Sequence, residues 1–146
     1  VFGPRQRPDS AYAAVIPKWI DALVKGQPVD IHGDGETTRD FCPVENVVEA
    51  NLRAALVDLP EGAPRVFNVG LGEETSLNQL YQTLQRRIAE LSGSTHLPAP
   101  RYGPERAGDV RFSRADIDQA RRWLGFEGRR SLNDSLAETV RWFRTP

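Results

Sequence analysis

Two arginine-containing phrases stand out among the residues that could do chemistry. Arg39 follows a glycine-rich turn in the phrase GDGETTRDF. Arg106 and Asp109 flank Gly108 in a second phrase, ERAGDVR. A guanidinium group is planar and donates two parallel hydrogen bonds, a geometry that suits phosphate oxygens. Both phrases are therefore candidate anion-binding elements.

Each phrase also has a purely structural interpretation. Arg39 could pair with a neighbouring carboxylate, either Asp40 or Glu36. The second phrase could be a charged surface loop. For single charged residues at such spacing the structural interpretation is the commoner one, so the two phrases alone do not decide the matter.

The sequence contains no catalytic group of a recognised type. No glycine-rich dinucleotide loop follows a predicted strand, because Gly70 and Gly72 have no third glycine at the required distance. There is also no Tyr-x-x-x-Lys motif, since Tyr12 lies six residues before Lys18. We expect no catalytic residue and no bound cofactor on this chain.

Composition excludes several other classes of function. Charged residues make up 27% of the 146 residues and leave a net charge of −1, so no field of one sign predicts a nucleic-acid or membrane partner. The single cysteine, Cys42, excludes an intramolecular disulfide, and with two histidines it cannot close a zinc site. No apolar run approaches the ~20 residues that span a bilayer. We expect a cytoplasmic protein without a metal.

Alternating helical and strand-like patterns predict an α/β fold that is mostly helical with short strands. Ser76 and Gln79 predict a capping box at the start of the strongest helix. Helices are expected over residues 11–25, 44–59, 76–91, 113–124 and 131–143. A hairpin is expected between residues 28–32 and 37–42, and an extended connection over 92–104.

Two further segments have the pattern of buried β-strands. They are Val1-Phe2 and residues 65–69, whose sequence RVFNV is strongly β-forming. Both need neighbouring strands that the rest of the sequence does not supply. Because the chain opens at Val1 inside a strand-like phrase, we expect the natural protein to extend further toward its N-terminus. We also expect the exposed edges to favour self-association.

Taken together, the phrases resemble the C-terminal half of extended short-chain dehydrogenases/reductases, in particular the nucleotide-sugar 4-epimerases. In the family's order and spacing they are VFGPRQ, AYAAVIPKW, GDGETTRDF, VENVVEANL, FNVG and RAGDVRFSRAD. The second and third are most similar to UDP-N-acetylglucosamine 4-epimerases. The resemblance implies that residues 1–146 are the C-terminal nucleotide-sugar-binding portion, with pieces of an incomplete Rossmann sheet and without the N-terminal NAD-binding Rossmann domain.

The resemblance also implies roles for the charged phrases. Arg39, Arg106 and Asp109 match the family residues that hold the diphosphate and the ribose of the nucleotide. The sequence departs from its relatives at Glu73-Glu74, where they often carry a basic residue. Two carboxylates beside a diphosphate would be unfavourable, so these side chains must point away or phosphate binding must be altered.

The family's uracil-contacting stretch corresponds to Ala14, Val15 and Lys18. The strand before the glycine-rich turn supplies further nucleotide contacts, which places His32 among the expected substrate-binding residues. Here the sequence has Asp30 and His32, where the closest relatives tend to carry tyrosine and asparagine.

We therefore expect this chain to bind the UDP part of a UDP-hexose within an NAD-dependent 4-epimerase of polysaccharide biosynthesis. The sugar pairs implied are UDP-GlcNAc/UDP-GalNAc and UDP-glucose/UDP-galactose. The chain alone is expected to be inactive, with NAD bound by the missing domain and the full-length enzyme a homodimer. The alternatives are a nucleotide-sugar 4,6-dehydratase or decarboxylase, and a non-enzymatic nucleotide-sugar-binding module.

Overall fold

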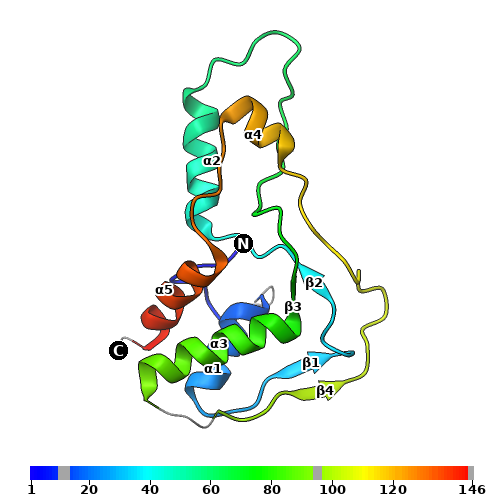
Figure 1. The fold of residues 1–146 in the computed structure, drawn as a ribbon, viewed down its shortest axis with the longest axis vertical. Helices are drawn as coiled ribbons and strands as arrows, with labels where there is room; N and C mark the ends of the chain where they lie inside the picture. The colour runs from blue at the N-terminus through cyan, green and yellow to red at the C-terminus, as the bar shows by residue number, and fades with distance from the viewer. Residues whose placement is uncertain (10–13, 94–96, 145–146) are drawn as a thin grey trace.

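The computed structural model describes residues 1–9, 14–93 and 97–144, and its helices form two groups (Figure 1). The larger group packs three helices against one another. The smaller group packs two helices at the opposite end of the molecule. The larger group consists of α1 (Val15–Val24), α3 (Leu77–Ser92) and α5 (Leu132–Arg144), and the smaller of α2 (Val44–Leu56) and α4 (Asp118–Leu124).

In the larger group, apolar residues that recur at helical spacing in the sequence lie on the buried faces of the helices. In α1, Ile16, Ile20 and Leu23 are at most 1% exposed, and they pack against Leu84 of α3 and Val140 of α5 in one core. Side chains three and four residues apart share one face of a helix, so this burial follows from their spacing. Pro17 lies in the first turn of α1, where its missing N–H breaks no helical hydrogen bond. Residues 11–13 of the predicted helix lie outside the described residues.

The predicted capping box is present at the start of α3. The Ser76 hydroxyl accepts the backbone N–H of Gln79 at 3.2 Å, and the Gln79 side chain accepts the backbone N–H of Ser76 at 2.9 Å. We expect Ser76→Ala to lower the free energy of unfolding by ~1 kcal/mol, because one backbone donor of the first turn loses its partner. Urea denaturation measures this. Ser113→Ala, at an exposed serine, is the control, and equal midpoints for the two variants would contradict the capping role.

The predicted hairpin is wrong. Strand β1 (Asp30–His32) pairs in parallel with β4 (Arg101–Gly103), which falls inside the predicted extended connection. Strand β2 (Thr38–Arg39) pairs antiparallel with β3 (Thr75–Ser76). The turn at Gly33–Gly35 lies between β1 and β2 in the sequence, but the two strands belong to different sheets and do not pair with each other.

Contacts from distant segments explain why β2 does not fold back on β1. The Thr38 N–H donates to the Arg111 carbonyl at 2.8 Å, and the Thr37 carbonyl accepts the N–H of Leu77 at 3.1 Å. Beyond the turn, the chain is therefore held by the start of α3 and by the segment after β4. Neither contact can be read from local sequence.

The two segments expected to be orphan strands are not strands in the described structure. Phe2 is buried but forms only an isolated bridge with Pro43. Residues 65–69 pair with no described strand; Phe67 and Val69 pack against the smaller core, while Val66 is 85% exposed. Strong β-propensity does not produce a strand where no neighbouring strand offers hydrogen bonds.

Helix α2 begins at Val44 as predicted and ends three residues before the predicted end, at Leu56. Its apolar spacing predicts a buried face formed by Val44, Val47, Val48, Leu52 and Ala55, but the helix buries a different face. The Asn46 side chain donates to the Arg130 carbonyl at 2.9 Å and accepts the Arg130 N–H at 3.0 Å, which fixes the rotation of the helix. Ala50 then faces the smaller core, and the predicted apolar face is exposed at Val48 and Leu52. Apolar periodicity therefore predicts the position of this helix but not the face that it buries.

Helix α4 begins at Asp118, five residues later than the earliest predicted start at Ser113. The backbone N–H of Ala115 is drawn to the carboxylate of Asp40, so the chain before α4 stays extended. The helix ends at Gly125, which adopts the left-handed conformation at φ 62° that is common at helix C-termini. At the start of α5 the Ser131 hydroxyl accepts the N–H of Asp134 at 3.1 Å.

Candidate functional site

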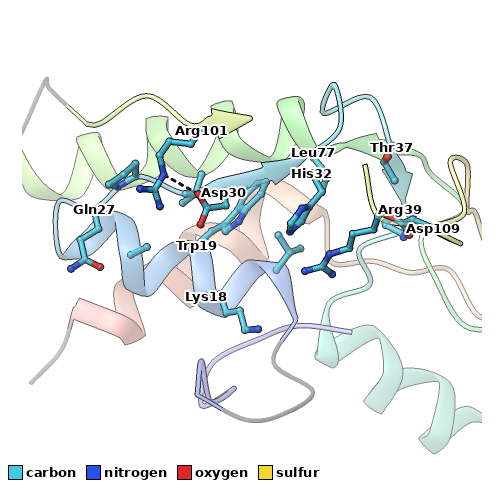
Figure 2. Close-up of a pocket in the computed structure, with 15 residues that line it drawn as sticks. Lys18, Trp19, Gln27, Asp30, His32, Thr37, Arg39, Leu77, Arg101 and Asp109 are labelled. Carbon is cyan, nitrogen blue, oxygen red and sulfur yellow. Dashed lines mark hydrogen bonds and ion pairs between the residues drawn. The ribbon is translucent and has the colours of Figure 1, made fainter. Parts of the chain in front are cut away.

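A pocket of about 580 Å³ lies between α1, strand β1 and the segment that follows β4 (Figure 2). This volume falls within the range of small-molecule sites. Its two ends are both polar, with Asp30 and Arg101 at one and Arg39 and Asp109 at the other. The lining residues are Val15, Lys18, Trp19, Ala22, Gln27, Pro28, Val29, Asp30, His32, Thr37, Arg39, Leu77, Arg101, Arg106 and Asp109.

The structure brings six of the seven sequence-predicted site residues to this pocket. They are Val15, Lys18, His32, Arg39, Arg106 and Asp109. The seventh, Ala14, is not among the lining residues but immediately precedes α1 as its N-cap. Segments far apart in the sequence therefore converge on one cavity, although nothing in the geometry alone says which ligand they hold.

The long wall of the pocket is apolar. Trp19 and Val29 are buried side chains that reach the cavity from α1 and from the residue before β1. Leu77, the first residue of α3, and Val15 complete this wall. A planar aromatic or heterocyclic ligand would bury its faces here, while its polar groups could reach either charged end.

Arg39 is held by three acceptors. Its Nη1 donates to the carbonyls of Thr38 at 2.7 Å and Val110 at 2.5 Å, and its Nη2 forms an ion pair with Asp109. The neighbouring carboxylates that spacing suggested, Asp40 and Glu36, are not its partners. Asp109 lies 70 residues away in sequence, so proximity along the chain could not have identified it.

Asp40 has a different task, which the sequence analysis missed. One carboxylate oxygen accepts the N–H of Leu71 at 2.9 Å. The other accepts the N–H of Gly72 at 2.9 Å and of Ala115 at 3.3 Å. Asp40 thereby ties β2 to the Gly70–Gly72 turn and to the chain before α4.

The same contacts test whether the Gly70–Gly72 turn could hold a dinucleotide. A phosphate-binding loop needs backbone N–H groups that point at the ligand. In this turn the Asp40 carboxylate already accepts two of them, and a Cβ at Gly70 would lie 2.5 Å from Asp40 Oδ2. The turn does not fit the pyrophosphate of NAD.

The pocket is lined by four lysine and arginine side chains and two carboxylates, although the whole chain has a net charge of −1. Arg101 pairs with Asp30 at 2.9 Å, and Arg39 pairs with Asp109. Within the described part of the chain, Lys18 and Arg106 line the pocket without a side-chain partner. A local excess of positive charge with uncommitted donors favours an anionic ligand.

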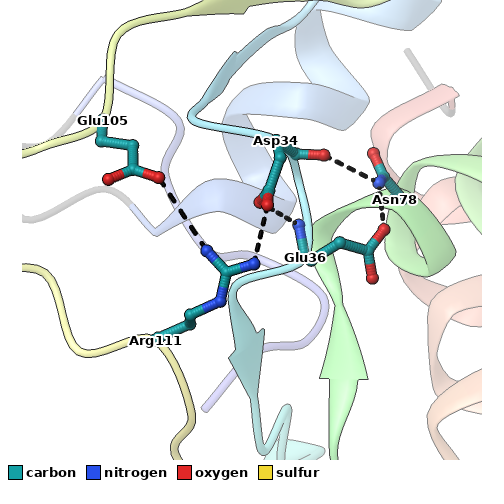
Figure 3. A network of polar contacts seen from close by, with 5 residues as sticks. All are labelled: Asp34, Glu36, Asn78, Glu105 and Arg111. Atoms are coloured by element: carbon teal, nitrogen blue, oxygen red, sulfur yellow. Dashed lines mark hydrogen bonds and ion pairs between the residues drawn. The ribbon is translucent and has the colours of Figure 1, made fainter.

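A network of polar contacts lies at the turn of residues 33–35, close in sequence to the lining residues Thr37 and Leu77 (Figure 3). Arg111 pairs with Asp34 at 2.7 Å, and this hydrogen bond holds the pKa of the Asp34 carboxyl below its usual range. The Asn78 side chain donates to Glu36 at 2.6 Å and to the Asp34 carbonyl at 3.1 Å. The network joins the turn, the start of α3 and the segment after β4.

Gly35 allows this close approach. Its φ is +77°, and a Cβ there would lie 2.1 Å from Asn78 Oδ1. Only glycine satisfies both the left-handed backbone and the missing space. Arg111 and Gly35 are therefore supporting residues of the site that motif reasoning placed near it without assigning them a task.

The structure shows where the residues that depart from the family pattern, Glu73, Glu74 and His32, lie relative to the pocket. Glu73 and Glu74 are exposed and do not line the pocket, so they place no carboxylate in it. His32 does line the pocket, and its Nδ1 lies 3.3 Å from the Pro104 carbonyl. Trp19 and Arg101 line the pocket as well, but neither was a predicted site residue. Trp19 lies in the predicted helix 11–25, and Arg101 lies in the predicted connection 92–104.

The described residues lack two further features, a cluster of side chains placed to hold a metal ion and a helix able to span a membrane. No group of three or more His, Cys, Asp or Glu side chains is placed to hold a metal ion in the described part of the chain. Burial raises the pKa of the Cys42 thiol to about 11, which disfavours the thiolate that metals bind. None of the helices described is long and apolar enough to cross a membrane.

Comparison with known proteins adds a family to this geometry. Residues 1–70 match the model of the NAD dependent epimerase/dehydratase family. The crystal structure of UDP-glucose 4-epimerase from Thermotoga maritima with UDP-glucose superposes with a TM-score of 0.83 at 40% identity, over 98% of this chain and 43% of that one. The chain therefore resembles this family of extended short-chain dehydrogenases/reductases, in sequence over residues 1–70 and in fold over nearly the whole chain. The predicted α/β architecture of an epimerase C-terminal portion is thereby confirmed.

Two curated members of the family show how broad the similarity is. UDP-glucose 4-epimerase from Mycolicibacterium smegmatis is 39% identical over 99% of this chain and 43% of its own length. UDP-N-acetyl-alpha-D-glucosaminuronate decarboxylase from Bacillus cytotoxicus is 30% identical over 99% of this chain and 44% of its own length. The chain thus spans less than half the length of these relatives, and their reactions differ.

Proposed function

We propose that the pocket binds the UDP part of a UDP-hexose, and that the protein containing this chain is an NAD-dependent 4-epimerase. The observation that carries the proposal is the convergence of Lys18, Arg39 and Arg106 on one apolar-walled cavity. The three relatives described above are all named for UDP-linked sugars. Their common element is UDP, which is an anion with a planar base.

The chemistry of the lining suggests how UDP is oriented. The diphosphate would lie at the end with Arg39 and Arg106, where guanidinium groups can donate to phosphate oxygens. The uracil would lie between the start of α1, at Val15 and Lys18, and His32 of β1. Asp109, beside Arg39, would then face the ribose, whose hydroxyls can donate to a carboxylate.

We further propose that residues 1–146 are the C-terminal nucleotide-sugar-binding portion of the enzyme. The Gly70–Gly72 turn does not fit NAD, so NAD and the acid–base groups would be held by residues outside this chain, in an enzyme that we expect to be a homodimer. This chain holds the nucleotide while the sugar reacts. Binding that is equal for substrate and product does not lower the chemical barrier, but it positions the sugar and keeps it tethered.

A decarboxylase is the second candidate because of the 30% identity to the Bacillus cytotoxicus enzyme. Epimerisation and decarboxylation of a UDP-linked sugar both require UDP to be bound in the same way, so the pocket is compatible with either reaction. The sugar-facing residues decide between them. An assay of the whole protein with NAD separates the two: interconversion of UDP-GlcNAc with UDP-GalNAc or of UDP-glucose with UDP-galactose supports the epimerase, whereas carbon dioxide release from a UDP-hexuronic acid supports the decarboxylase.

Calorimetry on the chain itself tests the binding proposal. We expect UDP and UDP-glucose to bind with similar affinity, and uridine to bind more weakly because it lacks the diphosphate. We also expect the chain alone to leave UDP-hexoses chemically unchanged. Uridine binding as tightly as UDP would contradict the assignment of the arginines to the diphosphate.

A further inference from the structure

Arg39 and Arg106, at the proposed diphosphate-binding end of the pocket, differ in the number of N–H donors that are free to bind a ligand. Arg106 has no side-chain partner among the described residues, so its guanidinium is available to a ligand. Arg39 is already engaged by Thr38, Val110 and Asp109. Two of these acceptors are backbone carbonyls, which position the guanidinium, but Asp109 is a charged group that neutralises it.

The ion pair is accessible to ligands. The side chains of Arg39 and Asp109 are 31% and 39% exposed, and both line the cavity. A phosphate that approaches Arg39 therefore meets a guanidinium with three of its five N–H donors engaged and with its charge already neutralised by Asp109. If the ligand displaces Asp109, a carboxylate is left beside a diphosphate, and two anions at such short range repel each other.

The segment that carries Asp109 cannot readily move away. On one side of Asp109, the carbonyl of Val110 accepts from Arg39 at 2.5 Å, and Arg111 pairs with Asp34 at 2.7 Å. On the other side, the Asp109 N–H donates to the Arg106 carbonyl at 3.2 Å in a tight turn. These contacts hold the Asp109 carboxylate beside Arg39.

We propose that Asp109 is a specificity-determining residue that makes the pocket reject bare diphosphates and accept nucleoside diphosphates. A ligand with a ribose offers two hydroxyl donors to the displaced carboxylate, whereas inorganic diphosphate has no ribose hydroxyls and presents a more highly charged anion. Hydrogen bonds from the ribose therefore offset the free-energy cost of opening the Arg39–Asp109 ion pair when a nucleoside diphosphate binds, but not when inorganic diphosphate binds. The ribose contact rests on the proposed function, but the competition between Asp109 and phosphate for Arg39 rests on the contacts above.

The test compares inorganic pyrophosphate with UDP by isothermal titration calorimetry on the whole chain. For Asp109→Asn we expect pyrophosphate to bind at least about fivefold more tightly than to the wild type, because Arg39 loses its charged competitor. UDP binding should gain less than about twofold or weaken, because the ribose loses a charged acceptor. The preference for UDP over pyrophosphate therefore falls.

Two controls separate this effect from net charge and from folding. Asp118→Asn removes one negative charge at the exposed start of α4 and should leave pyrophosphate affinity within about twofold of the wild type. Asp109→Glu retains the carboxylate and should keep pyrophosphate binding weak, so that this conservative variant reports on the charge if Asp109→Asn folds poorly. Circular dichroism verifies the fold of each variant.

Outcomes that overturn the two proposals are distinct. Pyrophosphate affinity that is unchanged or lower in Asp109→Asn, or equally raised in Asp109→Glu, overturns the role of Asp109 even if UDP binds well. Absence of UDP binding to the wild type overturns the proposed function, and a gain for pyrophosphate in Asp109→Asn would still stand by itself.

Discussion

Arg39→Ala is expected to weaken UDP binding by ~1.5–3 kcal/mol, the range of a hydrogen bond to a charged group. The structure predicts that its effect exceeds that of Arg106→Ala. Removing Arg106 deletes one donor that has no other partner in the described chain. Removing Arg39 deletes a donor and also leaves Asp109 without its counter-ion beside the diphosphate.

Calorimetric titration of UDP into the two variants measures this order. Arg65→Ala serves as the control, because Arg65 is an exposed arginine outside the pocket whose loss changes net charge by the same amount. We expect the control to bind UDP within about twofold of the wild type. Equal affinities for all three variants and the wild type would return Arg39 and Arg106 to a purely structural role.

Asp40→Ala is expected to lower the free energy of unfolding by about 3 kcal/mol. Three backbone N–H groups lose their acceptor, and each such loss costs ~1–3 kcal/mol before water replaces part of it. The β2 strand would then lose its connection to the Gly70–Gly72 turn and to Ala115. Because Arg39, the last residue of β2, directly precedes Asp40, the affinity for UDP should fall as well.

Urea denaturation of Asp40→Ala beside Asp116→Ala gives a matched comparison. Asp116 accepts a single backbone N–H, that of Asp118 at 3.0 Å, in an exposed position. We expect its replacement to cost ~1 kcal/mol or less, a typical value for one neutral donor. Similar losses for the two variants would show that the Asp40 contacts add little to stability.

The helices of the larger group could be predicted from the sequence because their determinants are local. The stripe from Leu80 to Ile88 and the Ser76–Gln79 box specify α3 through residues three and four positions apart. The rotation of α2 could not be predicted in this way. It is set by Asn46 and Arg130, which are 84 residues apart.

The strand pairing could not be predicted either, because it also depends on contacts between segments that are far apart in the sequence. The turn at Gly33–Gly35 predicts a hairpin locally, but the strands that follow it and precede it pair with β3 and β4. Those partners are chosen by packing between distant segments, which single-sequence patterns do not encode. The residues 65–69 show the converse, where a strong propensity finds no neighbour among the described strands.

For the candidate site, motif resemblance performed better than spacing. Spacing favoured Asp40 or Glu36 as the partner of Arg39, whereas the structure shows Asp109. The resemblance placed Lys18, Arg39 and Arg106 in one site, and they do line one pocket. Their role in binding UDP stays a prediction, and neither approach singled out Asp40 or Asn78 as supporting residues.

The most direct test of UDP binding at this pocket is a titration of UDP into the isotope-labelled chain. Nuclear magnetic resonance of the arginine side chains monitors the titration. We predict that the Nε–Hε signals of Arg39 and Arg106 shift with one common dissociation constant, while the signal of Arg65 stays in place. UDP binding that leaves the signals of Arg39 and Arg106 unmoved would contradict the assignment of this pocket to the nucleotide.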